Sequence, residues 1–158
     1  PKYLFVLARI FSSFINLMAS FTALLLVMVA VRAELHWTLF LSWFPLLMVV
    51  VFSLGVGMLL AALTVRFRDI MHLYSVFTTG LMYLTPVIYP MSMLPDRIRS
   101  IVLLNPLTNY LEMFRNLAFY NTLPSFSSVV VGGLEGAAAI VLGVYVFYKN
   151  QDEFILNI

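Results

Sequence analysis

The side chains that could do chemistry in this 158-residue chain are few and far apart. Glu135 is acidic and lies within a long apolar run, where an ionisable group costs roughly 2.5 kcal/mol or more at the centre of a membrane helix. Its carboxylate could face a substrate path or pair with a buried arginine, or it could lie near the outer interface and reach water. The two histidines, His36 and His72, fall at opposite predicted membrane faces and cannot share a metal ion.

The sequence contains no motif for catalysis or nucleotide hydrolysis. No Gly-x-x-x-x-Gly-Lys-Ser/Thr loop is present, and neither Gly-x-Ser-x-Gly nor His-Glu-x-x-His occurs. Because no nucleophile–base pair or metal cluster falls at membrane depth, we expect no catalytic residue and no bound metal. The sequence also lacks the internal repeats typical of secondary transporters and the repeated filter typical of ion channels.

The composition is that of an integral membrane protein. The chain is 63% hydrophobic and 10% charged, with a mean hydropathy of +1.01, whereas soluble domains are about 45–50% apolar and about 25% charged. The net charge of +2 is too small to indicate nucleic-acid binding, and the scattered arginines are typical of membrane flanks. Cysteine is absent, so the sequence gives no information on redox compartment.

These patterns predict an all-α integral membrane protein, a multi-span helical bundle. Apolar runs predict spans at about 10–31, 39–65, 70–86 and 129–148. A crossing helix needs about 20 apolar residues, but the run from Ile70 to Leu84 has only roughly 15, so it crosses barely or enters and turns back. We expect residues 1–158 to form a single transmembrane domain, and the start at Pro1 indicates part of a longer protein.

Polar and small residues predict how the spans meet their surroundings. The first span has a polar stripe that indicates either helix packing or a pore lining. This stripe comprises Arg9, Ser12, Ser13, Asn16 and Ser20. Small residues permit close helix approach, and they form ridges at Ser53, Gly57 and Ala61 in the second span and at Gly132, Gly136, Ala139 and Gly143 in the last.

Prolines divide the segment that follows the short third span. Pro86 removes a backbone donor and disfavours helix at Thr85, and Asn105-Pro106 breaks the chain again. Two short helices are predicted within about 96–120, with Asp96 as the N-cap of the first, and both are expected to be interfacial or re-entrant. Broken apolar segments at membrane depth occur only where they are buried in protein or line a wet cavity, so this one indicates a transport path.

The short loop between the second and third spans sets the orientation. It contains Arg66 and Arg68, and the positive-inside rule therefore predicts that it is cytoplasmic and that residues 87–128 are external. Arg68 and Asp69 could position this loop against a partner protein. They could equally be a positive-inside anchor and the N-cap of the next helix.

An ordered set of motifs resembles the type-2 ABC exporter permeases, in the subgroup that moves lipid-linked polysaccharides, O-antigens and teichoic acids. The resemblance covers nearly the whole chain, including the C-terminal region from Gly143 through Phe147-Tyr148-Lys149 to Phe154-Ile155. The remaining motifs, in order, are Phe67-Arg68-Asp69-Ile70, Leu84-Thr85-Pro86-Val87-Ile88-Tyr89-Pro90, Leu104-Asn105-Pro106-Leu107 and Phe114-Arg115.

The resemblance implies a fold of six spans, of which this chain would hold the third to sixth, with re-entrant external gate helices. The gate residues would be Pro86, Tyr89, Pro90, Asn105, Pro106 and Arg115. The cytoplasmic entrance and coupling residues would be Lys2, Arg66, Arg68 and Asp69. The path lining would include Ser75, Thr79 and Tyr83, with Glu135 as a further candidate whose role the family does not fix.

The resemblance also implies partners and a location. The permease would work as a homodimer in the bacterial cell membrane, surrounded by membrane lipids, and would bind no nucleic acid. It would bind no cofactor itself, because ATP would act through a separate ABC ATPase subunit that docks on the cytoplasmic face. The substrate would be a polyprenyl-linked glycan. The alternatives are a drug- or antibiotic-exporting ABC permease and a non-transport membrane scaffold.

Overall fold

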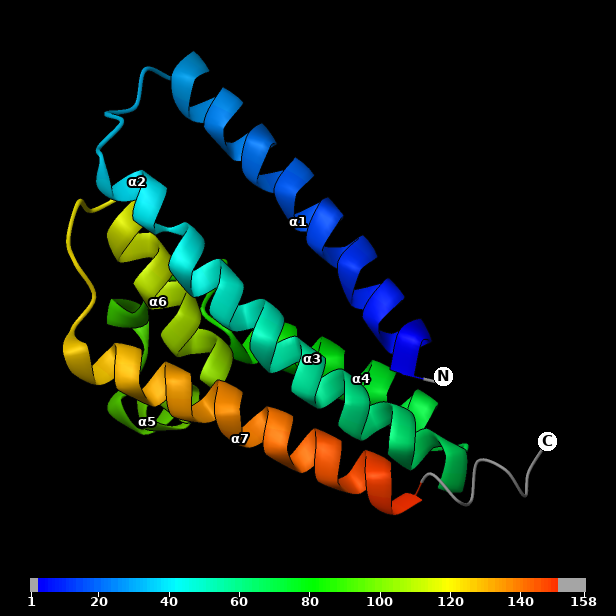
Figure 1. Ribbon diagram of the computed structural model, residues 1–158. Coiled ribbons are helices and arrows are strands. Elements are labelled where there is room, and N and C mark those ends of the chain that lie inside the picture. Colours follow the sequence, from blue (N-terminus) through cyan, green and yellow to red (C-terminus); the bar gives the residue numbers. More distant parts are fainter. Residues whose placement is uncertain (1–2, 151–158) are drawn as a thin grey trace.

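The computed structural model describes residues 3–150, and the regular elements among them are all helical, which confirms the predicted all-α class (Figure 1). One further element is a short 3-10 helix, η1. In chain order the elements are α1 (Tyr3–Ala30), α2 (Thr38–Leu41), α3 (Trp43–Arg66), α4 (Ile70–Leu84), η1 (Met91–Met93), α5 (Asp96–Leu103), α6 (Pro106–Ala118) and α7 (Phe126–Asn150).

Three helical segments are long and apolar enough to cross a membrane, namely Leu4–Ala30, Thr38–Arg66 and Phe126–Asn150. The helix α1 begins at Tyr3, before the predicted start of the first span at residue 10. By contrast, α4 has 15 residues. Its length is therefore about 22 Å, which is less than the roughly 30 Å hydrocarbon core of a bilayer.

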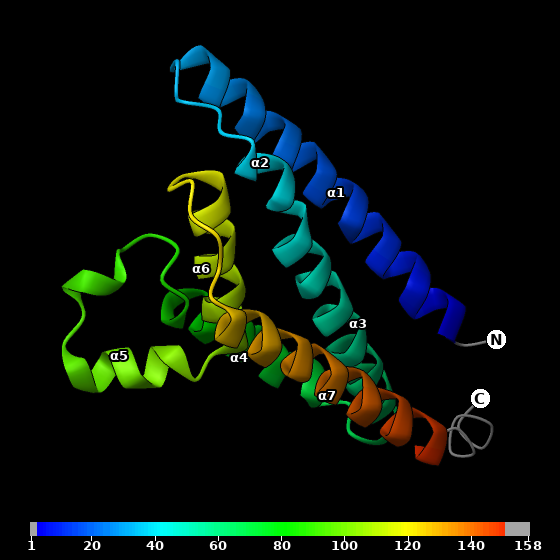
Figure 2. The ribbon, with the colours of Figure 1, turned by 60° about the vertical axis from the view of Figure 1, so that its left-hand side comes forward.

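The long helices place charged residues at two opposite ends of the molecule. The start of α1, the turn between α3 and α4, and the end of α7 lie at the same end in Figures 1 and 2. This end carries Arg66 and Arg68, whereas Arg32 and Glu34 lie in the α1–α2 loop at the other end. The short helix α4 runs back from the 66–69 turn beside α3.

The closest helix pair is α3 and α7, which lie side by side over much of their lengths (Figure 1). A methyl group on Gly55 would collide with the backbone of Ala139 and Ile140, and one on Gly143 would collide with the backbone of Gly55. The predicted ridge of α7 therefore packs as expected at its C-terminal part. On α3 the close approach is at Gly55, while Gly57 faces α1.

A second packing centre joins α1, α2 and α6. Phe21, Met28, Leu39 and Ala118 form a buried cluster, and the rings of Phe21 and Trp43 lie 4.9 Å apart edge to face. Edge-to-face contacts of this kind add about 0.5–1.5 kcal/mol beyond area burial. This cluster fixes the C-terminal end of α6 against the loop-proximal ends of α1 and α3.

Other parts of the bundle are exposed. None of the residues of α4 is buried. The polar stripe of α1 is also exposed along its length. In α5, Asp96 is the first helical residue rather than the predicted N-cap, because Pro95 precedes the helix with extended backbone angles.

We expect Gly55→Ala to lower the stability of the bundle by about 1–3 kcal/mol, because the added Cβ cannot fit against the backbone of α7. The matched control is Gly80→Ala in α4, where a Cβ would meet no atom within 4 Å. Thermal unfolding of the purified variants in detergent provides the measurement. Equal unfolding temperatures for the two variants would contradict the close α3–α7 packing.

Candidate functional site

The helix α4 ends where the proline-containing segment begins. Pro86 disfavours helical angles in the preceding residue, and Thr85 accordingly has extended angles. The backbone nitrogen and the hydroxyl of Thr85 both donate to the carbonyl of Leu81, each at 2.8 Å. Thr85 thus satisfies one of the carbonyl groups that a helix end leaves without a partner.

Asn105 connects the end of α4 to the start of α6. Its Nδ2 donates to Thr85 Oγ1 at 2.8 Å, and its Oδ1 accepts from the backbone nitrogen of Leu107 at 3.1 Å. The second bond is an N-cap, and Pro106 fills the first helical position, where a missing N–H has no consequence. Both Thr85 and Asn105 are buried, so a single amide side chain starts α6 and also holds it against α4.

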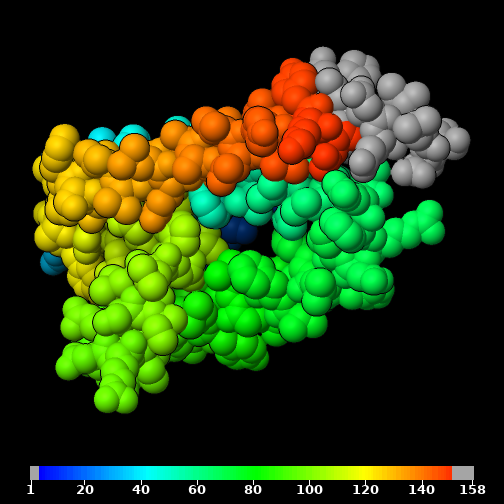
Figure 3. Space-filling model, turned by 90° about the horizontal axis from the view of Figure 1, so that it is seen from below, coloured from blue at the N-terminus to red at the C-terminus, as the bar shows by residue number. Residues whose placement is uncertain are grey.

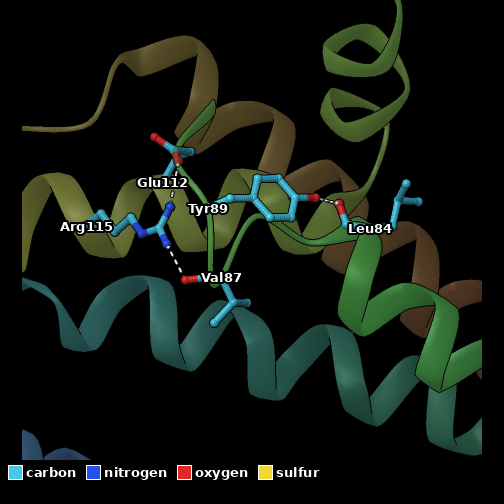
Figure 4. A network of polar contacts seen from close by, with 5 residues as sticks. All are labelled: Leu84, Val87, Tyr89, Glu112 and Arg115. Carbon is cyan, nitrogen blue, oxygen red and sulfur yellow. Dashed lines mark hydrogen bonds and ion pairs between the residues drawn. The ribbon is translucent and has the colours of Figure 1, made fainter. Parts of the chain in front are cut away.

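Two further side chains hold the loop between α4 and α5 (Figure 4). The guanidinium of Arg115 on α6 donates to the carbonyl of Val87 at 3.0 Å and contacts the Glu112 carboxylate at 3.4 Å. The hydroxyl of Tyr89 donates to the carbonyl of Tyr83 at 2.8 Å and lies 3.4 Å from that of Leu84. The loop is therefore bonded to the end of α4 on one side and to α6 on the other.

We call this arrangement the hinge cluster, defined by Thr85, Val87, Tyr89, Asn105 and Arg115. It brings together three of the predicted gate residues, and Pro86 and Pro106 lie in the chain directly beside its members. The sixth, Pro90, is exposed and precedes η1. The gate residues predicted from the sequence did not include Thr85 or Val87. A threonine directly before Pro86 is the feature of the sequence that could have indicated Thr85.

Glu135 lies on α7 against α6. Its carboxylate lies near the side chain of Asn109, and its Oε2 is buried without a hydrogen-bond partner in the described part of the chain. Nearby, Asn109 Nδ2 donates to the carbonyl of Ser128 at 3.0 Å, and the Tyr110 hydroxyl donates to that of Gly132 at 2.9 Å. Glu135 thus belongs to the contact between α6 and α7 and is not beside the other predicted path residues.

Those other residues form an exposed stripe on α4. Ser75, Thr79 and Tyr83 are all exposed, and the Thr79 hydroxyl donates to the carbonyl of Ser75 in its own helix at 3.0 Å. The space-filling view in Figure 3 shows the side of α4, in green, uncovered between the ends of the molecule. Other residues within 3–150 therefore leave this polar and aromatic stripe uncovered.

The predicted coupling residues lie at the turn between α3 and α4. Arg66, Arg68 and Asp69 are exposed, and the Arg66 guanidinium lies 5.7 Å from the centre of the Phe67 ring. Asp69 is at the N-cap position of α4, but its side chain makes no capping bond. Lys2 lies outside the described residues.

The described residues contain no group of three or more side chains arranged to hold a metal ion. Because the hinge cluster bonds α4, the loop and α6 together, a displacement of the end of α4 would be transmitted to α6. An apolar cavity of about 390 Å³ lies beside the cluster and is lined by Thr85, Val87, Leu107, Leu111 and residues of α1 and α3.

Comparison with known proteins identifies similar sequences. The family model described as "ABC-2 type transporter" matches residues 2–119. The chain is 29% identical over 119 residues to an O-antigen export system permease protein RfbA of Klebsiella pneumoniae, which covers 72% of the chain and 46% of that protein. It is 28% identical over 119 residues to the RfbA of Myxococcus xanthus, which covers 73% of the chain and 46% of that protein. The chain thus spans a little under half the length of these curated relatives.

Thr85→Val should destabilise the fold by about 1–3 kcal/mol, because it leaves the buried amide of Asn105 without its acceptor. Thr78→Val is the matched control, since the Thr78 hydroxyl is exposed and bonds only to the carbonyl of Tyr74 in its own helix. Thermal unfolding of both variants measures the difference. If they unfold at the same temperature, the Thr85–Asn105 bond does not hold α6 to α4.

Proposed function

The chain belongs to the ABC-2 type transporter family, and from that premise we propose that it forms the membrane permease of an ATP-driven exporter of lipid-linked polysaccharide. The teichoic-acid-type glycans are included in this substrate class. In this proposal the chain is a transport subunit of the bacterial inner membrane and hydrolyses no ATP itself. The curated relatives are O-antigen export permeases by name, which favours a glycan over other cargo.

The observation that carries the proposal is the hinge cluster. A helix too short to cross a bilayer is followed by a proline-containing loop and two short helices. A buried bond between Asn105 and Thr85 and an exposed bond between Arg115 and Val87 tie these parts together. Irregular backbone at membrane depth is stable only where protein or a wet cavity satisfies its polar groups. The segment 87–120 therefore fits a gate over the external end of a path, with α4 beside that path.

The exposed stripe on α4 is suited to line such a path. A glycan offers hydroxyl groups that donate and accept hydrogen bonds and sugar faces that stack on aromatic rings. Ser75 and Thr79 supply hydroxyls, and Tyr83 supplies both a ring and a hydroxyl. In the dimer that we propose, the same helix of a second copy would lie across the path.

The surface that we propose for the ABC ATPase is the turn between α3 and α4. The exposed side chains of Arg66, Arg68 and Asp69 give this turn charge at the predicted cytoplasmic end, where a separate ABC ATPase would dock. ATP binding and hydrolysis on that subunit would move α4 through this turn. The hinge cluster would then carry the movement to α6.

To test the function, we expect the full-length permease to co-purify with an ABC ATPase whose rate of hydrolysis rises when a polyprenyl-linked glycan is added. The polyprenyl carrier without its glycan is the matched control and should leave the rate unchanged. Stimulation by hydrophobic drugs and not by the glycan would instead identify a drug exporter. An ATPase rate that no added substrate changes would contradict an export function.

A separate substitution tests the path. Thr79→Trp should reduce glycan export severalfold without changing the amount of permease in the membrane, because the indole would fill space beside the stripe. Leu73→Trp is the matched control, since Leu73 is also exposed on α4 but lies roughly 120° around the helix from Thr79. Export can be followed by the appearance of glycan at the cell surface. Normal export in the Thr79 variant would remove this face of α4 from the path.

A further inference from the structure

The helix α5 has charged residues at one end and apolar residues at the other. Asp96, Arg97 and Arg99 lie in its first turn together with one apolar residue, Ile98. Ile101 and Leu103 lie in its last turn, and Leu104 is its C-cap. The chain therefore changes from charged to apolar over an axial rise of about 12 Å. A change over this distance resembles the step from the headgroup region to the hydrocarbon of one bilayer leaflet.

The apolar side chains of α5 are uncovered. Ile101 is 55% exposed and Leu104 is 81% exposed, whereas only Val102 within the helix is buried. Figure 2 shows α5 standing away from the long helices on the side opposite α1, and Figure 3 shows it as a lobe at the lower left. Exposed apolar residues on a projecting element of a membrane protein need an apolar partner.

The arginines of α5 have no protein partner within residues 3–150. Both Arg97 and Arg99 are exposed, and neither takes part in an ion pair or a side-chain hydrogen bond. Arg115 differs, because its guanidinium contacts both Glu112 and the carbonyl of Val87. The two positive charges on α5 are therefore available to an anionic group outside the chain.

The orientation of α5 places the charges of Arg97 and Arg99 at a depth where anionic headgroups occur. In Figure 2 the N-terminal end of α5 lies farther from the 66–69 turn than does its C-terminal end. The arginines are thus nearer the membrane surface opposite that turn, and the apolar residues are deeper. A guanidinium near a membrane surface extends toward the headgroups while its aliphatic stem stays in apolar surroundings.

We propose that α5 is a lipid-binding helix that docks on anionic phospholipid headgroups, with Arg97 and Arg99 bound to their phosphates and Ile101 and Leu104 in the hydrocarbon below. The guanidinium fork suits phosphate oxygens, with which it can form two parallel hydrogen bonds. The occupant of this face is the membrane leaflet opposite the 66–69 turn.

The docking has a structural consequence for the hinge cluster. Leu104 is followed directly by Asn105, the residue that starts α6 and bonds to Thr85. Lipid contacts along α5 therefore set the depth of the α5–α6 junction in the bilayer. The composition of the leaflet would then influence the position of α6.

The test measures the depth of α5 in vesicles. The variant Leu104→Cys is made in a form of the full-length permease that has no other cysteine, and a nitroxide label is attached to it. The labelled protein is reconstituted in phosphatidylglycerol–phosphatidylcholine vesicles. The label should be more accessible to dissolved oxygen than to a water-soluble nickel complex. Each arginine near an anionic surface gives about a fivefold preference, so R97Q with R99Q should shift the balance toward the water-soluble reagent by up to roughly 30-fold.

The controls separate charge from shape and from position. R97K with R99K keeps both charges and should retain most of the protection of the label. Arg32→Gln removes an exposed arginine from the α1–α2 loop and should leave the label at its original depth. Pure phosphatidylcholine vesicles should reproduce the effect of the double glutamine variant.

Two results would overturn the proposal. The first is that the accessibility of the label to the two reagents is the same in the double glutamine variant and in the Arg32 variant, and also the same in both kinds of vesicle. The second is efficient disulfide formation between unlabelled Leu104→Cys residues of two copies, which would show that a second chain covers this face. Neither readout uses export or ATP hydrolysis, so these results are independent of the proposed function.

Discussion

The amide of Asn105 is the interaction on which the external half of this structure depends. An asparagine has two donor hydrogens and one acceptor oxygen, and here each kind has a different role: the oxygen starts α6, and the nitrogen holds the end of α4. A buried polar group that loses its partner costs about 1–3 kcal/mol. The two helices are therefore coupled in register, because neither can shift without leaving a polar atom of Asn105 or Thr85 unpaired.

This coupling matters because the rest of α4 is held weakly. The helices α3 and α7 meet through backbone at Gly55 and Gly143 and form a rigid pair, but α4 buries no residue against them. Its fixed points are the turn at Arg66–Asp69 and the hinge cluster at Thr85. A helix fixed at its two ends and exposed along its length is suited to transmit a displacement from the 66–69 turn to the hinge cluster.

The sequence was sufficient to predict the helical class, the apolar runs and the break after Leu84, because each depends on local chemistry: hydropathy, helix length and the absent N–H of proline. It also predicted a break between two short helices at Asn105-Pro106, but not that Asn105 caps the second helix and Pro106 begins it. The carbonyl groups that accept from Arg115 and Tyr89 could not be predicted, since any residue supplies a carbonyl. The choice of Gly55 over Gly57 as the contact with α7 depends on helix rotation, which a ridge of small residues at i, i+4 and i+8 does not fix.

Glu135 illustrates how an ionisable residue of a long apolar helix can be placed in the contact between two helices. Its carboxylate lies where Gly132 and Gly136 allow α6 to come close to α7, and a Cβ at Gly132 would lie 3.0 Å from the ring of Tyr110 and 3.3 Å from Asn109 Nδ2. The small residues thus leave the space in which Asn109, beside Glu135, donates to the carbonyl of Ser128. Polar bonds to α7 on one side and to α4 on the other hold α6 between them. Since α7 is rigidly packed on α3 and α4 is not, displacement of α4 would strain the Asn105 side of α6 first, and the Glu135 side would act as the fixed support.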